Sequence, residues 1–436
     1  MNDEKKDGVK DDLEVEEKES GPQGHSRRDF LKLSGTALVA AGLSGAAGGI
    51  FGKAPLVRAA EPPIKVGVTL AYTGLNAVAG PRIEHGLRLA FAQSRYRDRV
   101  KFFIEDTQMK PEVAIEKARK LFDRDRVHLL AGPIMGHESL AVSQFLKSQK
   151  RLMLLAFGGN IKLCGEDCSR YTFLCNHTPW NQSAPAVDWF LKAFGNKAFL
   201  FGSDYSVSRD VVQYFQGPFE KKGGQVVGTF FSPLNTTEFA PYLAKIQSAN
   251  PKPKALFGLL SGNDCMNFLK QYDEFGLRKQ GIPAIFGLGA VTKTFVGTLK
   301  DTAVGHYNVF HWSPWLDNPE NKAFLAAYRK MFNEDADEQS ICGYEVGLMM
   351  VKGLEAAGGK PEDTEGMING IEKVDYVGPK GRVQMGPNHV AKVPVYAFKI
   401  VKKGNTYVSE MAASLGSWGT PYGADGPGGA CKIAKG

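Results

Sequence analysis

The sequence lacks the short motifs of several common enzyme classes. It contains no G-x-S-x-G, no H-E-x-x-H and no Walker loop, and no G-x-G-x-x-G follows the first predicted strand. These absences argue against a nucleophile-elbow hydrolase, a zincin protease, a P-loop nucleotidase and a dinucleotide-binding oxidoreductase. The eight histidines are scattered along the chain. We therefore expect no catalytic residue, no bound metal and no cofactor.

Dense basic tracts and long apolar runs are also missing. The formal net charge is +8, but Lys and Arg are spread out rather than clustered, so the sequence predicts no nucleic-acid partner. Beyond residue 60 no stretch is long and apolar enough to span a membrane. The composition, 43% hydrophobic and 11% aromatic with 50 dispersed glycines, is that of a globular protein.

The first 59 residues have the pattern of a leader. Residues 1–25 are polar and acidic, with nine Asp or Glu and four Lys. A twin arginine at Arg27 and Arg28 then precedes a weakly apolar run and a small-residue cleavage site ending at Ala59, which is typical of Tat export. A membrane anchor is the weaker alternative, because glycines interrupt the run. We predict an acidic leader and Tat signal peptide over 1–59, and a periplasmic location for the remaining chain.

The segment from Ile64 to Phe91 has the pattern of a β-loop-α unit, with a strand to Leu70, a turn-rich loop and a helical apolar stripe. Strands and helices then alternate without tight hairpins in two series, separated by an extended connection at 170–180. This alternation predicts two α/β domains with parallel sheets of similar size. Near the C-terminus short turns link strands, and a Gly/Ser/Pro-rich tail begins at Ala412.

Short motifs in a fixed order carry a family resemblance: Thr73-Gly74 before Gly80, Gly132-Pro133, Phe201 to Tyr205, Asn263-Asp264 before Phe268 to Gln271, and Trp312 to Pro314 before Leu316 to Pro319. Together they resemble the branched-chain amino acid type (type I) of periplasmic solute-binding proteins. The resemblance implies an α/β fold of two doubly wound parallel-sheet lobes joined by three hinge crossovers. It also implies that the hinge closes on a small molecule and presents it to an ABC importer.

The same resemblance implies the bounds of the lobes. Lobe 1 would comprise residues 64–177 plus 306–378, and lobe 2 would comprise 178–305 plus 379–411. Residues 412–436 would form the C-terminal tail.

The resemblance further implies which loops meet the ligand. In lobe 1 the loops after the third and fourth strands would hold a carboxylate, through Gly136, Ser139, Phe157, Gly158 and Gly159. In lobe 2 Tyr205 would supply an aromatic ring and Asp264 would accept an ammonium, while Trp312 lies near another predicted loop. Because hydroxyl side chains are scarce in the lobe 1 loops, an aromatic or otherwise apolar carboxylate competes with an α-amino acid as the ligand class.

Three of these residues also have simpler explanations. Asp264 opens a predicted helix, where aspartate commonly caps the N-terminus. Tyr205 would pack across the hinge, and Trp312 would lie in the core or at the rim. The sequence leaves both interpretations open for each residue.

The cysteines allow either a metal site or disulfides. Four residues have C-x3-C-x6-C-x-H spacing: Cys164, Cys168, Cys175 and His177. This spacing fits structural zinc only loosely. In an exported protein we expect instead a disulfide between Cys164 and Cys168, with Cys431 paired to Cys265 or Cys342. The connectivity of six cysteines is not deducible from sequence.

The sequence thus predicts an extracytoplasmic solute-binding protein rather than an enzyme. Its ligand would be a small carboxylate-bearing molecule, such as an amino acid, an amide or an aromatic acid. Its partners would be that ligand and a membrane ABC permease, and the protein would be a monomer. One alternative is an exported sensory lobe, which would share the fold. The other is a Tat-exported redox or metal enzyme, since that pathway commonly carries cofactor-loaded enzymes.

Overall fold

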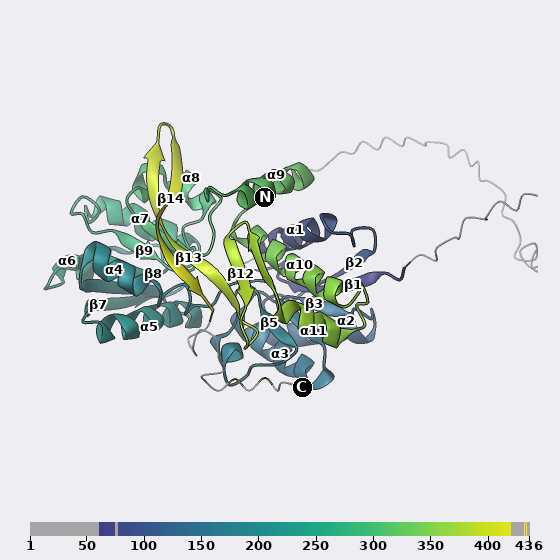
Figure 1. The fold of residues 1–436 in the computed structure, drawn as a ribbon. Coiled ribbons are helices and arrows are strands. Elements are labelled where there is room, and N and C mark those ends of the chain that lie inside the picture. The colour runs from purple at the N-terminus through teal and green to yellow at the C-terminus, as the bar shows by residue number, and fades with distance from the viewer. Residues whose placement is uncertain (1–60, 75–76, 420–430, 432, 434–436) are drawn as a thin grey trace, which may run out of the picture. The chain divides into compact units, whose positions relative to one another are not determined.

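The computed structural model describes residues 61–74, 77–419, 431 and 433 (Figure 1). The leader and Tat signal predicted at 1–59 lie outside these residues. No helix in the described ranges combines the length and the apolar character needed to cross a bilayer.

The first sheet, as described, has five parallel strands in the order β2-β1-β3-β4-β5. These strands are β1 (Ile64–Leu70), β2 (Val100–Asp106), β3 (Leu129–Ala131), β4 (Leu152–Leu155) and β5 (Thr172–Leu174). The sequence predicted the first four, but it assigned β5 to the extended connection at 170–180. A strand of only three residues at a sheet edge carries too little periodicity to be recognised.

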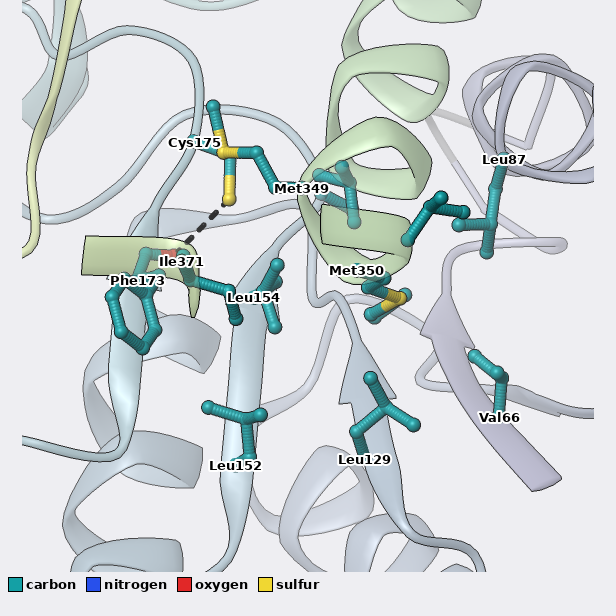
Figure 2. Packing of buried hydrophobic residues seen from close by; sticks show 14 of the residues in the cluster. Val66, Leu87, Leu129, Leu152, Leu154, Phe173, Cys175, Met349, Met350 and Ile371 are labelled. Carbon is teal, nitrogen blue, oxygen red and sulfur yellow. Dashed lines mark hydrogen bonds between the residues drawn. The ribbon is translucent and has the colours of Figure 1, made fainter. Parts of the chain in front are cut away.

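Helices cover both faces of this sheet: α1 (Ala79–Ala92), α10 (Glu338–Ala356) and α11 (Thr364–Glu372) on one, and α2 (Pro111–Asp123) and α3 (Gly136–Gln149) on the other. The alternation of side chains along each strand explains both layers. On β4, Leu152 and Leu154 face the first set of helices, whereas Met153 and Leu155 face the second. Figure 2 shows the first layer, where Met349 and Met350 of α10 pack among aliphatic side chains of the sheet.

The α1 and α10 helices approach so closely that two glycines are required. A Cβ atom at Gly86 would lie 1.9 Å from the carbonyl oxygen of Ser340, and one at Gly343 would lie 1.9 Å from that of Ile83. Any larger residue would push the helices apart. The contact joins chain segments more than two hundred residues apart, so α10 belongs to the first lobe.

The second sheet comprises nine strands among the described residues, in the order β11-β12-β13-β10-β9-β8-β6-β7, with β14 also paired to β13. The strands are β6 (Lys197–Ser203), β7 (Gln225–Ser232), β8 (Ala255–Leu259), β9 (Ala284–Phe286), β10 (Tyr307–Phe310), β11 (Asp375–Gly378), β12 (Gly381–Met385), β13 (Ala391–Lys403) and β14 (Thr406–Trp418). The strands from β6 to β10 pair in parallel, and those from β10 to β14 pair antiparallel. The sheet is therefore larger and more mixed than predicted.

This sheet is also covered on both faces: by α4 (Ala186–Phe194) and α5 (Ser206–Lys221) on one, and by α6 (Ala240–Ser248), α7 (Asn263–Glu274) and α8 (Lys293–Leu299) on the other. On β6, Ala198 and Leu200 face α4 and α5, while Phe199 and Phe201 face the other three helices. Three shorter or peripheral elements complete the fold: η1 (Ile161–Cys164), η2 (Lys300–Ala303) and α9 (Pro319–Phe332).

Two crossings between the lobes differ from the implied bounds. The strand β10, placed in lobe 1 by the bounds 306–378, pairs instead with β9 and β13 of the second sheet. The third crossing was placed at 378/379, yet Val383 and Val393 pack in the first core while Val395 packs in the second. The crossing therefore lies within β13, because a strand of 13 residues is long enough to contribute to both cores.

The predicted tail is partly a strand. Residues from Ala412 to Trp418 continue β14 and pair with β13, so that the two strands run side by side as a long ribbon (Figure 1). The register between β13 and β14 shifts at two places along the ladder. Such irregularities let a Gly/Ser-rich segment pair as a strand.

Candidate functional site

The predicted lobe 2 residues gather where two neighbouring parallel strands end. β6 ends at Ser203, two residues before Tyr205, and β8 ends shortly before Ser261 and Asp264. The Ser203 hydroxyl donates to Asp264 Oδ2 at 3.1 Å and accepts the Ser261 amide at 3.1 Å. The carboxyl edge of a parallel sheet is where open α/β folds bind ligands, and the structure brings Tyr205 and Asp264 together there.

Asp264 is buried, with 2% of its surface exposed. Burial raises the pKa of its carboxyl group, and this effect is opposed by hydrogen bonds from Ser203 and from the backbone of Asn235 and Thr236. Asp264 is not the N-cap of α7, because that position is taken by Gly262 in a left-handed conformation with φ of 51°. Its carboxylate instead ties three loops of the second lobe together.

Tyr205 is half-buried beside this carboxylate. Burial raises the pKa of its phenol to about 12; the Asp264 charge adds to the shift and a hydrogen bond with Ser261 opposes it. The phenol is therefore neutral at physiological pH and acts as a hydrogen-bonding aromatic group. It precedes α5 directly, as the N-cap residue.

The predicted groups of the α3 loop are largely engaged within the lobe. Gly136 is the first residue of α3, and its carbonyl oxygen accepts the Ser139 hydroxyl at 2.8 Å. Ser139 is fully buried. Its hydroxyl hydrogen is thus used within the first turn of α3.

The loop after β4 is fixed against the first crossing. Gly158 forms a β-bridge with His177, and the Gly159 amide donates to the His177 carbonyl oxygen at 3.3 Å. A Cβ atom at Gly159 would lie 2.5 Å from a methyl group of Leu174, so this position requires glycine. The half-buried Phe157 ring stands edge-on to the His177 imidazole, with 4.7 Å between centroids.

Trp312 lies in the core. It is 1% exposed, its Nε1 donates to Asn321 Oδ1 at 2.7 Å, and its ring meets Phe324 edge-on. This placement is the one that the simpler core interpretation expected, and ligand contact by Trp312 stays a prediction.

The disulfide pairing was predicted wrongly. Cys168 is bonded to Cys431, while Cys164, Cys175, Cys265 and Cys342 are free and buried. Cys164 ends η1 and packs in the core between α3 and the sheet. Because Cys168 is used in the bond to Cys431, it is not a free ligand for the zinc-like set of Cys164, Cys168, Cys175 and His177 that the sequence spacing fitted only loosely.

Two residues near His177 were not proposed by sequence reasoning for any binding site, although Cys342 was considered as a disulfide partner. His311 follows β10, and Cys342 lies in α10. The Cys342 Sγ atom lies 3.8 Å from His311 Nε2, and the two imidazole rings are stacked with centroids 5.0 Å apart. Burial, with a smaller contribution from the Lys380 charge, lowers the pKa of His177 to about 3 and that of His311 well below its usual value. No signal in the linear sequence could have joined these positions.

A buried ion pair lies next to this cluster. Lys380 Nζ lies 4.0 Å from a carboxylate oxygen of Glu345 and donates to Asn176 Oδ1 at 3.0 Å. The Asn176 side chain in turn donates to the Cys342 carbonyl oxygen at 3.2 Å, and the Tyr376 hydroxyl donates to Glu345. This network joins the first crossing to α10 and to the segment before β12.

Two hollows of the described surface lie away from the predicted site. One, of about 450 Å³, is lined mainly by α5 and β7, and the other, of about 370 Å³, by α1, α9, α10 and the segment around β11. Neither is lined by a residue that the sequence proposed for ligand contact. The candidate site therefore rests on the loop cluster at the strand ends.

Comparison with known proteins supports the fold as a whole. A family model described as periplasmic binding protein matches residues 63–405. A Leu/Ile/Val-binding protein homolog 6 of Brucella melitensis is 26% identical over 368 residues, covering 82% of this chain and 93% of that protein.

Two solved structures are similar over nearly their whole length. An ABC transporter substrate-binding protein from Sphaerobacter thermophilus has a TM-score of 0.77 at 28% identity, covering 81% of this chain and 98% of that one. A solute binding protein of an R. palustris ABC transporter, in complex with 4-hydroxybenzoate, has a TM-score of 0.73 at 25% identity, covering 81% and 97%. The predicted fold class is thereby confirmed, and the chain belongs to the periplasmic binding protein family, as a type I solute-binding protein of an ABC transporter.

Proposed function

We propose that this protein captures a small aromatic carboxylate and delivers it to a membrane ABC permease, without chemical conversion. Export by the Tat pathway, cleavage after Ala59 and a monomeric state belong to the same proposal. Capture would proceed by hinge closure, in which the ligand stabilises the closed form and the permease distinguishes that form from the open one.

The burial and hydrogen bonding of Asp264 are the observation that supports an aromatic acid over an amino acid as the ligand. An α-amino acid needs an acid for its ammonium, and Asp264 is the residue that the family resemblance assigns to this role. Here the carboxylate is buried and already accepts the Ser203 hydroxyl and backbone groups of two loop residues. These three hydrogen bonds already take up most of the roughly four that a carboxylate can accept, so little acceptor capacity is left for an ammonium.

The aromatic residues support the same choice. Tyr205 and Phe157 are both half-buried at predicted ligand loops, one in each lobe. Their flat rings, of which Tyr205 also carries a hydroxyl, suit a flat aromatic ligand, because offset or edge-on ring pairs add about 0.5–1.5 kcal/mol beyond area burial. The R. palustris protein in complex with 4-hydroxybenzoate provides a precedent at 25% identity.

A thermal-shift comparison tests the ligand class. The mature chain is heated with 4-hydroxybenzoate, benzoate, leucine or glutamine, each at the same concentration. A ligand that binds only the folded state raises the melting temperature, so the aromatic acids should raise it and leucine should not. A shift with leucine alone would overturn the proposed class.

Two variants sharpen this test. Tyr205→Phe keeps the ring and removes only the hydroxyl, whereas Asp264→Asn keeps the shape and removes only the charge. If the ligand is an aromatic acid, Asp264→Asn should retain the shift with 4-hydroxybenzoate. If an amino acid shifts the wild type and fails to shift Asp264→Asn, the carboxylate meets an ammonium after all.

The sensory alternative shares the fold and the ligand and differs only in the partner. Uptake of radiolabelled 4-hydroxybenzoate by cells that lack the protein distinguishes them. Transport should fall if the protein feeds a permease, and it should be unchanged if the protein serves only a sensor.

A further inference from the structure

Three buried side chains that are distant in sequence converge at one point of the first lobe. His177 lies at the first crossing, His311 at the second and Cys342 on α10, and each is at most 3% exposed. One potential ligand atom from each lies within 4.8 Å of the other two. Two imidazoles and a thiol at this separation are a set of metal donors that the solute-binding function does not use.

The imidazoles are poorly satisfied where they stand. The Nδ1 atoms of His177 and His311 are buried and have no hydrogen-bond partner among the residues that the structure describes. Their surroundings are largely aromatic, since Phe157 and Phe310 pack edge-on against His177. Buried polar atoms without partners cost free energy, so the described chain leaves part of the hydrogen-bonding capacity of both imidazoles unused.

The distances suit a small cation. In a planar three-coordinate site, metal–sulfur and metal–nitrogen bonds of about 2.3 and 2.0 Å place the sulfur about 3.7 Å from each nitrogen and the two nitrogens about 3.5 Å apart. The 3.8 Å between Cys342 Sγ and His311 Nε2 is close to this spacing. The third ligand atom must approach by about one ångström, and because the ring planes of His177 and His311 are 28° apart, His177 must also turn about its side-chain torsions.

The donor type and the charge select the ion. Thiolate and imidazole favour soft or borderline ions such as Cu(I) and Zn²⁺. A buried ammonium lies beside the cluster, since Lys380 Nζ donates to the side chain of Asn176, the neighbour of His177, and Glu345 is its buried counter-ion. A thiolate bound to a monovalent ion is neutral and adds no charge beside Lys380, whereas a divalent ion would leave one uncompensated positive charge in a buried site.

We propose that His177, His311 and Cys342 form a three-coordinate binding site for one Cu(I) ion. On binding, the Cys342 S–H bond breaks, its electron pair forms the sulfur–copper bond, and the proton leaves to solvent. The copper stays Cu(I) throughout, so no oxidant or reductant is consumed. The ion would connect two crossings with α10, independently of which solute the protein carries.

Competition with a chromophoric chelator tests the site. Cu(I) is added anaerobically to the mature protein in the presence of bicinchoninate. The wild type should withdraw about one equivalent, and Cys342→Ser should bind at least about 100-fold more weakly, since even outer-shell partners are worth about 10- to 100-fold in affinity. Cys265→Ser is the matched control, because Cys265 is also free and fully buried but lies in the second lobe.

Two further measurements keep the proposal falsifiable if a variant folds poorly. X-ray absorption of the wild-type copper complex should show sulfur and nitrogen neighbours in the ratio of one to two. His311→Asn should lose the nitrogen signal in part while circular dichroism reports an intact fold. Equal copper binding by the wild type and Cys342→Ser, or a site with two or more sulfur neighbours, would overturn the proposal; preference for Zn²⁺ over Cu(I) would overturn the choice of ion.

Discussion

The two lobes solve the same packing problem with different side chains. The sheet of the first lobe is covered mainly by Val, Leu, Ile and Met, whereas that of the second is packed around phenylalanine rings, including Phe201, Phe268 and Phe286. Phe268 stacks on Phe201 at 5.3 Å and meets Phe239 edge-on at 5.5 Å. Aliphatic layers tolerate small shifts, but ring pairs have preferred geometries, so the second core should be the more sensitive to truncation.

The lobes also differ in how the chain builds them. The first sheet depends on α10 and α11, which return to it from the C-terminal half of the chain, and a disulfide ties its loop at Cys168 to Cys431. The second core draws most of its residues from one continuous stretch, between Ala186 and Val309. The first lobe therefore depends more on long-range contacts and cross-links, and the second more on local packing.

Truncating the second core should have the largest effect. Phe268→Ala removes a fully buried ring and should cost about 3–5 kcal/mol of unfolding free energy. The matched change in the first lobe, Leu154→Ala, should cost about 2–5 kcal/mol. Urea unfolding followed by near-ultraviolet circular dichroism measures both. A loss below about 1 kcal/mol for Phe268→Ala would contradict the claim that the ring cluster supports the second lobe.

Removing the disulfide should affect the first lobe. Cys431→Ser opens a link between residues separated by 263 positions and should cost about 2–4 kcal/mol. Thermal unfolding with and without reductant measures this. Reductant should lower the melting temperature of the wild type to that of the variant and leave the variant unchanged. If reductant lowers the melting temperature of the variant as much as that of the wild type, the Cys168–Cys431 bond is not the source of the reductant-sensitive stability.

The free energy of unfolding should depend on pH through His306 in the second lobe. This histidine is fully buried, and its Nδ1 accepts the Ala284 amide at 3.0 Å. Burial lowers its pKa to about 3, with smaller contributions from the Arg278 charge and opposing ones from Asp273 and from the hydrogen bond.

Since the folded pKa lies below the unfolded value of about 6.5, the unfolded chain takes up the proton first. The contribution of the neutral, buried His306 to the free energy of unfolding is therefore complete above pH 6.5, and it is lost as the pH falls toward 3. By pH 5 it should have fallen by about 2 kcal/mol. His306→Asn, which keeps an acceptor, should show a smaller difference between its unfolding free energies at pH 7 and pH 5. Equal pH dependence in both proteins would mean that His306 does not stay neutral when folded.

The smallest expected effect concerns the ligand. Tyr205→Ala should weaken binding of 4-hydroxybenzoate about tenfold, which corresponds to about 1.4 kcal/mol, because the ring contact is lost. Isothermal titration calorimetry measures the dissociation constant. Asp204→Asn is the control, since Asp204 is the exposed neighbour whose carboxylate pairs with Arg209. Unchanged affinity in Tyr205→Ala would remove this residue from the site.

Local patterns predicted the alternation of strands and helices and the first β-loop-α unit. The predicted unit from Ile64 to Phe91 contains β1 and α1 at the expected positions, because their periodicity is strong over several residues. The family resemblance implied that Tyr205 and Asp264 lie near each other, and in the structure both follow strands that end at the same edge of the second sheet. The short strand β5 and the continuation of β14 did not follow, since each depends on a partner elsewhere in the chain.

The sequence by itself determined the α/β class, the family and the division into two lobes, because these depend on periodicity and on motif order. Only the tertiary structure decided that Cys168 bonds Cys431, that the Ser139 hydroxyl donates within its own helix and that His177 meets His311 and Cys342. The physical reason is the same in each case. Side-chain chemistry depends on which groups come within a few ångströms of each other, and residues that are far apart along the chain reach that distance only when the lobes fold.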